Sequence, residues 1–315
     1  MHTSKVALII IYNHKYDKNI DLLEKIYENR FSSIYHLVPF YTGDKPNVIP
    51  VYENSFYFQG YIAQGLKSFF DEKAMHYFFV ADDMIINPAI NENNYSDYFN
   101  VDDNTSFLPD FFNVHREEYW PHRLKGFLFQ LDKGGIEVKG ELPSYQEAES
   151  RLLKIGAIKR PLEQERSLRW IDLHEKPGRN LLVKENRTRS AHQFSDFVHK
   201  KEYRLSYPLA ASYSDILLVS ARNIKQFCHY CGVFAALDLF VEMAIPTALA
   251  LSADKIVTEK DLAYEGKPLW LEAVSEFLSP YKNNLELLIT NYPENVLYIH
   301  PIKLSQWDCS CLKNK

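Results

Sequence analysis

The chain has 315 residues, of which 46% are hydrophobic and 24% charged, and its formal net charge is −5 at pH 7. The length fits one large domain or two small ones, and the composition is that of an ordinary globular protein. The negative charge argues against a general nucleic-acid-binding protein, because such proteins carry an excess of basic residues.

The start of the chain carries no recognisable targeting signal. Residues 1–5 are too short for the charged region of a signal peptide, and the apolar run "VALIII" that follows has the length of a strand. No apolar stretch reaches the length needed to span a bilayer. We therefore expect a cytoplasmic protein, and peripheral contact with the inner face of the membrane stays open.

The first hundred residues alternate between strand-like and helix-like segments. Residues 5–12, 33–43 and 76–86 read as buried strands, and residues 19–31 and 57–71 have apolar residues at helical spacing. This order predicts βαβ units, and hence an α/β fold with a mostly parallel sheet flanked by helices. Ligands of such sheets bind beyond the carboxyl ends of the strands. No G-x-G-x-x-G turn or Walker A sequence is present, so neither a dinucleotide fingerprint nor a P-loop is expected.

The rest of the chain divides into two parts. Residues 101–206 are rich in polar and charged residues and predict an irregular inserted, lid-like region, with a helix at 144–156 that begins at a Ser cap. Residues 207–315 resume the strand and helix order and complete the domain that residues 1–100 begin. Within them, 236–252 reads as one apolar helix interrupted near Pro246.

Two adjacent carboxylates stand at the end of the third predicted strand, in "YFFVADDMIINP" (77–88). Burial of a charge is costly, so Asp82 and Asp83 require an explanation. At a strand end they are well placed to hold a divalent cation through oxygen ligands. The alternative is structural, with one Asp capping the turn and the other solvated.

This pattern resembles the metal-binding region of the GT-A-fold nucleotide-sugar-dependent glycosyltransferases of the bacterial surface-polysaccharide type. An apolar strand, an Asp-containing step and a second apolar strand follow a βαβαβ start, as in that family. The resemblance implies that Asp83 is a direct ligand of Mn²⁺ or Mg²⁺ and that Asp82 contacts the nucleotide sugar. Ala81 stands where the family has its first acid.

The same resemblance extends to the C-terminal third. In "YIHPIK", His300 ends a predicted strand and Lys303 follows three residues later. The family often supplies a C-terminal His as a further metal ligand, and imidazole is a permitted ligand of such ions. The resemblance therefore implies His300 as a metal ligand and Lys303 as a contact to the diphosphate.

Glu242 stands in the otherwise apolar helix predicted at 236–252, four residues after Asp238. Four residues is one helical turn, so the two acids are expected to share a face. A carboxylate in apolar surroundings has a raised pKa and can act as a base. Inverting members of the family use such a residue, so Glu242 and Asp238 are the candidate catalytic residues. The alternative is a structural pair between Glu242 and Arg222.

Further binding residues are assigned by position. Asn13, Tyr41 and Asp44 follow the first two predicted strands and would contact the base and ribose, and Arg222 is placed with them in the nucleotide-sugar site. Three residues of the inserted region are candidates for acceptor contacts: Trp120, His122 and Arg123.

We expect a metal-dependent glycosyltransferase with a UDP-sugar or related donor and a glycan or lipid-linked acceptor, as in the synthesis of a bacterial surface polysaccharide or lipo-oligosaccharide. One alternative is a sugar nucleotidyltransferase, although "YNHKYDKN" after the first strand lacks the glycine such enzymes carry there. Another is a non-catalytic nucleotide-sugar-binding protein of the same fold. The pairs Cys228/Cys231 and Cys309/Cys311 could bind zinc or be free thiols.

Overall fold

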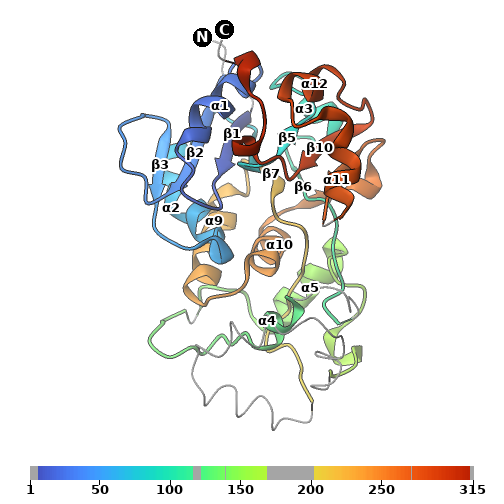
Figure 1. Ribbon diagram of the computed structural model, residues 1–315. Helices are drawn as coiled ribbons and strands as arrows, with labels where there is room; N and C mark the ends of the chain where they lie inside the picture. The colour runs from blue at the N-terminus through green and yellow to red at the C-terminus, as the bar shows by residue number, and fades with distance from the viewer. Residues whose placement is uncertain (1–5, 116–121, 139, 169–201, 271, 313–315) are drawn as a thin grey trace.

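The computed structural model describes residues 6–115, 122–138, 140–168, 202–270 and 272–312. A seven-stranded sheet has the order β3-β2-β1-β4-β7-β6-β8, and a three-stranded sheet has the order β5-β10-β9 (Figure 1). The strands are β1 (Val6–Ile11), β2 (Ile34–Pro39), β3 (Val48–Val51), β4 (His76–Ala81), β5 (Ile85–Ile86), β6 (Thr105–Phe107), β7 (Ile216–Ser220), β8 (Lys255–Val257), β9 (Glu265–Pro268) and β10 (Val296–His300).

Helices cover both faces of the large sheet. The helices of the described residues are α1 (Lys18–Tyr27), α2 (Gln59–Phe69), α3 (Tyr95–Tyr98), α4 (Arg123–Phe127), α5 (Tyr145–Ile155), α9 (Ile224–Ala236), α10 (Val241–Ser252), α11 (Glu272–Leu278) and α12 (Leu285–Thr290). Short 3-10 helices are η1 (Ser55–Tyr57), η2 (Leu162–Gln164), η3 (Glu259–Asp261), η4 (Ser279–Tyr281), η5 (Leu304–Gln306) and η6 (Ser310–Leu312). Among the described residues, none of the helices has the length and hydropathy needed to cross a lipid bilayer.

Strand β1 shows why its sequence is apolar without alternation. Its odd-numbered positions, such as Ile9, belong to the hydrophobic cluster that includes residues of α2, α9 and α10, whereas its even-numbered positions, such as Leu8, belong to the cluster that includes residues of α1 and α12. A strand buried on both faces needs apolar residues at every position. The predicted α/β class, with a mostly parallel sheet between helices, is confirmed.

The strand directions decide which chain ends meet. Strands β3, β2, β1 and β4 are parallel, but β7 is antiparallel to β4, with Val80 opposite Ile216 and His76 opposite Ser220. The carboxyl end of β4 therefore lies beside the amino end of β7, where Ala81 N donates to Asp215 O at 2.9 Å. The other end of β7 lies at the opposite edge of the sheet.

Two predicted elements differ from the structure. The segment 76–86 is not one strand, because the chain turns at Asp82-Asp83 and β5 then joins the small sheet. Residues 236–252 are not one helix either: α9 ends at Ala236, and α10 runs from Val241 through Pro246 without a break. Pro246 lies inside α10 and removes the intrahelical donor to the Glu242 carbonyl, which accepts a hydrogen bond from Ser212 N instead. Strand β3 had no counterpart in the predicted elements.

The described part of the predicted insertion is anchored on the main domain. Residues 105–107 form β6 inside the large sheet, so this part of the predicted insertion belongs to the sheet domain. Helix α5 begins with the predicted cap, since Ser144 and Glu147 form a reciprocal capping box. Its buried Ala148 and Leu152 join the same hydrophobic core as α9 and α10.

Candidate active site

The turn after β4 holds the two adjacent carboxylates. Asp82 continues the ladder of the strand, since its N–H donates to Ile11 O at 2.9 Å, and its side chain is 4% exposed. The backbone N–H of Asn13, just beyond β1, approaches Asp82 Oδ1 at 3.4 Å. The carboxyl ends of two parallel strands thus bring the predicted residues Asn13 and Asp82 together.

The small sheet brings His300 to the same turn. Strand β10 runs antiparallel to β5, with Ile299 opposite Ile85, and β5 follows the turn directly. Ile302 N donates to Asp83 O at 2.6 Å, which ties the chain after β10 to the turn. As a result, His300 Nε2 lies 2.9 Å from Asp83 Oδ1. Two residues predicted as metal ligands from distant parts of the sequence are in contact.

His300 lies in a buried and acidic environment. Only 8% of the residue is exposed, and its Nδ1 has no hydrogen-bond partner within the described part of the chain. Burial is the largest single influence and lowers the pKa of His300, but the carboxylates of Asp83, Asp215 and Asp82 outweigh it. The net pKa of His300 is therefore raised above its usual value.

Asp215 is a member of this site that sequence reasoning missed. It is half-buried just before β7, its backbone lies beside Ala81, and its charge interacts with His300 and Asp83. Burial raises the pKa of Asp215, and the charge of Asp83 raises it further, although His300 acts in the opposite direction. The sequence signal was an acid directly before an apolar strand, but placing it required knowing that β7 runs antiparallel. We call Asp82, Asp83, Asp215 and His300 the acidic centre.

Burial and the neighbouring carboxylate of Asp83 raise the pKa of Asp82 to about 7. The main cause is burial, the second is the charge of Asp83, and hydrogen bonds from Asn13 and Asn19 partly oppose them. A centre that binds protons this readily is one where a cation would relieve repulsion among the carboxylates.

The donor set fits a hard divalent cation. Asp83 Oδ1 has no aligned hydrogen-bond partner among the described residues, although it lies 2.9 Å from His300 Nε2. Two neighbouring ligands of an octahedral ion with bonds of about 2.1 Å are about 3 Å apart, so both atoms could face one ion. No group of three or more His, Cys, Asp or Glu in the described ranges is arranged to hold a metal by itself. Mg²⁺ is commonly bound by one or two side chains together with substrate phosphates and water.

Glu242 lies in the first turn of α10. Because Pro246 has no N–H, the carbonyl of Glu242 lacks its usual donor four residues later. Ser212 N donates to that carbonyl instead, at 3.0 Å. Ser212 precedes Asp215 by three residues, so this bond ties the first turn of α10 to the segment that enters the acidic centre.

Two of the predicted site residues are elsewhere. Asp238 does not share a helix with Glu242, because it lies in the link between α9 and α10 with φ of 56° and forms an ion pair with Lys133. Arg222 lies at the opposite edge of the sheet, because β7 is antiparallel, and it forms an ion pair with Asp103. Arg222 therefore pairs neither with Glu242 nor with the acidic centre.

The other predicted nucleotide contacts lie at the carboxyl edge of the sheet. Tyr41 and Asp44 are in the connection from β2 to β3, where the Tyr41 ring lies across its own turn and Asp44 is exposed. A Cβ at Gly43 would lie 2.2 Å from the Tyr41 hydroxyl oxygen, so a side chain there would displace the Tyr41 ring. Lys303 is exposed. It follows Ile302, whose backbone N–H donates to the Asp83 carbonyl.

The predicted acceptor residues can be placed in part. Trp120 lies outside the described residues. His122 precedes α4, and its ring stacks on that of Phe240 with centroids 4.3 Å apart. Phe240 lies two residues before Glu242. Arg123 is 3% exposed, so it is a buried residue and not a surface contact.

Trp270 is a second residue that the sequence did not single out. It follows β9, whose end pairs with the end of β10, and its indole lies 6.5 Å from the His300 ring. The side chain is nevertheless 58% exposed. In the apolar run "PLWLE" it could not be told from a core residue.

The four cysteines are all described, and none is in a disulfide. Cys228 and Cys231 are buried in α9, and burial raises the pKa of both thiols. A raised pKa disfavours the thiolate that binds zinc. The second pair lies near the C-terminal end, at Cys309 and Cys311.

Comparison with known proteins assigns no family to the chain. No model of a protein family matches it, and no curated protein matches its sequence. Its function is therefore inferred from the geometry and chemistry of the acidic centre.

Proposed function

We propose that the chain is a GT-A-type glycosyltransferase that moves a sugar from a nucleotide-diphosphate sugar to a glycan or lipid-linked acceptor with the help of Mn²⁺ or Mg²⁺. The observation that carries the proposal is the 2.9 Å contact between Asp83 and His300 beyond the carboxyl end of β4. The resemblance of "YFFVADDMIINP" to the family implies that an acid of this step and a C-terminal His bind the same ion. Their contact supports that pairing.

The chemistry requires the charge of the leaving diphosphate to be offset. A divalent cation supplies this when bound, since it stabilises developing negative charge. Asp83 and His300 would hold it, and Lys303 would add a positive charge from the exposed chain beside the Asp83 carbonyl. Asp82 and Asp215 surround this position and favour a cation over an anion.

Glu242 is the candidate general base. In an inverting transfer, the acceptor hydroxyl oxygen bonds to the anomeric carbon as the bond to the diphosphate oxygen breaks, and the hydroxyl proton passes to the base. Glu242 lies in the first turn of a helix that is fixed to the Ser212–Asp215 segment. A rigid backbone limits the drift of a catalytic side chain, which favours proton transfer.

The remaining residues would bind the donor. Asn13, Tyr41 and Asp44 lie beyond β1 and β2 and would contact the base and ribose. Trp270 presents an exposed ring near His300, where it could stack on a sugar or a base.

Non-catalytic binding of a nucleotide sugar is the second candidate. Two observations favour it: Ala81 occupies the position of the first acid of the family pattern, and no three side chains of the described chain are arranged to hold one metal ion. Such a protein would bind a nucleotide together with a metal but would release no nucleotide from the sugar.

The test is a panel of nucleotide sugars incubated with the protein and Mn²⁺ or Mg²⁺, with release of the nucleoside diphosphate as the measurement. We expect metal-dependent release from at least one donor, and its loss in Asp83→Asn. A thermal shift with Mn²⁺ and UDP, but no release with any donor or acceptor, would favour the binding protein. The proposal is rejected if no nucleotide raises the melting temperature with any divalent metal.

A further inference from the structure

The most exposed aromatic side chains follow the ends of strands. Among the described residues, three large hydrophobic side chains are more than half exposed, and all three are aromatic: Phe40, Tyr52 and Trp270. Phe40 follows β2, Tyr52 follows β3, and Trp270 comes two residues after β9. The carboxyl edge of a parallel sheet is where ligands bind, and Trp270 lies beside His300. The three rings are therefore placed for contact with a ligand.

Phe40 and Tyr52 form a pair that only the pairing of β2 with β3 brings together. Phe40 N donates to Val51 O at 3.0 Å, just before Tyr52. The two ring centroids are 6.0 Å apart with planes at 70°, so a planar group that lies on one ring is bordered by the other. Phe40 has a φ of 54°, and it is the one apolar side chain among the described non-glycine residues with positive φ. Bulky residues rarely adopt this conformation, and such strain gathers at ligand sites.

Trp270 lies on the other side of the acidic centre. Its backbone is fixed by the residue before it, since Leu269 N donates to His300 O at 2.7 Å. The indole meets the Tyr213 ring edge to face with centroids 6.1 Å apart, and it lies 6.5 Å from the His300 ring. Tyr213 is buried, and the residue before it donates to the Glu242 carbonyl. Trp270 therefore contacts the segment to which the candidate general base is tied.

The strand order places the acidic centre between the aromatic pair and Trp270. Strand β1 lies between β2 and β4, so Phe40 is two strand spacings, roughly 10 Å, from Asp82. On the other side, Asp83 contacts His300, and the His300 ring lies beside Trp270. Figure 1 shows the same order, with β3, β2 and β1 followed by β5 and β10. An aromatic pair, an acidic centre and a single ring thus follow one another along this edge.

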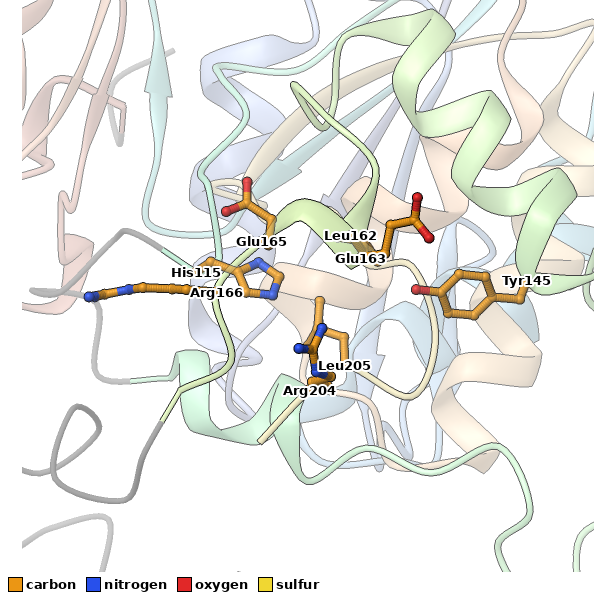
Figure 2. A pocket seen from close by; sticks show the side chains of 8 residues that line it. All are labelled: His115, Tyr145, Leu162, Glu163, Glu165, Arg166, Arg204 and Leu205. Carbon is orange, nitrogen blue, oxygen red and sulfur yellow. The ribbon is translucent and has the colours of Figure 1, made fainter. Parts of the chain in front are cut away.

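The cavity shown in Figure 2 is separate from this edge. It has a volume of about 220 Å³, and its lining includes His115, Tyr145 and Arg204 but no residue of the acidic centre and none of the three exposed rings. Two arginines and two glutamates line it, so the composition of the lining favours neither an anion nor a cation. The edge, in contrast, combines a candidate cation site with exposed rings on both sides.

We propose that the donor lies along this edge in one direction, with its base on Phe40 and Tyr52 and its sugar on Trp270, an assignment that rests on the proposed function. A nucleotide sugar has two rings joined by a diphosphate, which Asp83 and His300 would hold through the cation. The sugar is bonded directly to the diphosphate, whereas ribose separates the base from it. The sugar therefore reaches the nearer ring, and the base reaches the farther pair. Bases stack on aromatic rings, and the C–H groups of a sugar pack on the negative face of an indole.

The experiment is calorimetric titration of UDP, UDP-glucose, GDP and GDP-mannose into the full chain with Mn²⁺ present. For the nucleotide that binds, we expect Phe40→Ala and Tyr52→Ala to weaken the Kd values of the diphosphate and of its sugar conjugate equally, about tenfold, as for loss of base stacking. Trp270→Ala should weaken the Kd of the sugar conjugate about fivefold and leave that of the diphosphate within about twofold.

Two further variants separate lost stacking from lost stability. Met75→Ala truncates an exposed side chain at the amino edge of the sheet, directly before β4, and should change neither Kd. Phe40→Gly should weaken the binding of both ligands without lowering the melting temperature, because glycine adopts a φ of 54° without strain.

The direction of the donor is wrong if the two Kd values change equally, or not at all, in Trp270→Ala. Unchanged Kd values in both Phe40→Ala and Tyr52→Ala also overturn it. Either result leaves the proposed function standing, because wild type still binds the nucleotide with its metal. Absence of binding of all four ligands to wild type rejects the proposed function, and the direction of the donor falls with it.

Discussion

Two buried histidines lie at the ends of strands, His76 at the start of β4 and His300 at the end of β10. Both ring nitrogens of His76 have partners, the Tyr95 hydroxyl at 2.9 Å and the Thr105 carbonyl at 3.0 Å. By contrast, His300 has Asp83 at one nitrogen, while its other buried nitrogen has no partner within the described residues. A buried histidine with both nitrogens bonded is part of the framework, whereas His300, among carboxylates and with one nitrogen open, is a candidate site residue.

The difference extends to the two edges of the sheet. At the amino edge of β4, Arg222 and Asp103 form an ion pair, and Ser220 binds the Asp103 carbonyl at 2.6 Å. At the carboxyl edge, three acids gather with one histidine and the pKa values of Asp82 and Asp215 rise. Charges at the first edge are balanced, and charges at the second are not. The predictions below test this contrast.

The largest expected effect is on turnover. Asp83→Asn removes a charge from the candidate metal site, and we expect metal-dependent release of nucleoside diphosphate to fall about 100-fold or more. Asp103→Asn is the matched control, since it removes an acid from the opposite edge and should leave turnover within about twofold. Equal losses in the two variants would contradict the contrast between the edges.

The stability of the fold, unlike turnover, should depend more on His76 than on His300. His76→Phe leaves the Tyr95 hydroxyl and the Thr105 carbonyl without their buried partner, and we expect a loss of about 2–4 kcal/mol in the free energy of unfolding. His300→Phe removes a group with an unsatisfied nitrogen and should cost less than His76→Phe. Urea denaturation measures both, and a larger loss for His300→Phe would show that His300 is the structural residue.

The pH dependence of stability reports the crowding of acids. The pKa of Asp82 is about 7 in the folded protein, whereas the usual value of an aspartate, which serves for the unfolded chain, is 3.8. Between these values the folded protein retains a proton that the unfolded chain has lost, so stability falls as the pH rises through this window. Relative to Asp82→Asn, wild type should lose about 1 kcal/mol per pH unit between pH 5 and 7. Denaturation in EDTA at several pH values measures the free energy of unfolding. The same pH dependence of this free energy in wild type and Asp82→Asn would refute the prediction.

The smallest effect is expected at Lys303. This side chain is exposed, so its attraction for a diphosphate is screened by solvent. Lys303→Gln should raise the KM for the donor about two- to fivefold and leave kcat unchanged. Lys282→Gln, at another exposed lysine, is the control, and the contact is excluded if both variants behave as wild type.

Sequence patterns predicted much of the framework because burial dictates them locally. The apolar run of β1, the cap at Ser144 and the strand and helix order that resumes after residue 207 all depend on neighbours in the chain. The pair Asp82-Asp83 was visible for the same reason, as two charges at the end of an apolar strand. The interruption predicted at Pro246 was wrong, since the N–H that proline lacks inside α10 is replaced by that of Ser212, which donates to the Glu242 carbonyl.

The membership of the site depended on strand direction, which a local pattern does not encode. Asp215 enters the acidic centre and Arg222 leaves it for one reason, the antiparallel pairing of β7 with β4. The sequence by itself determined the α/β class, the buried strands and the two charged turns at Asp83 and His300. Only the tertiary structure decided that these turns meet, because β5 and β10 pair across most of the length of the chain.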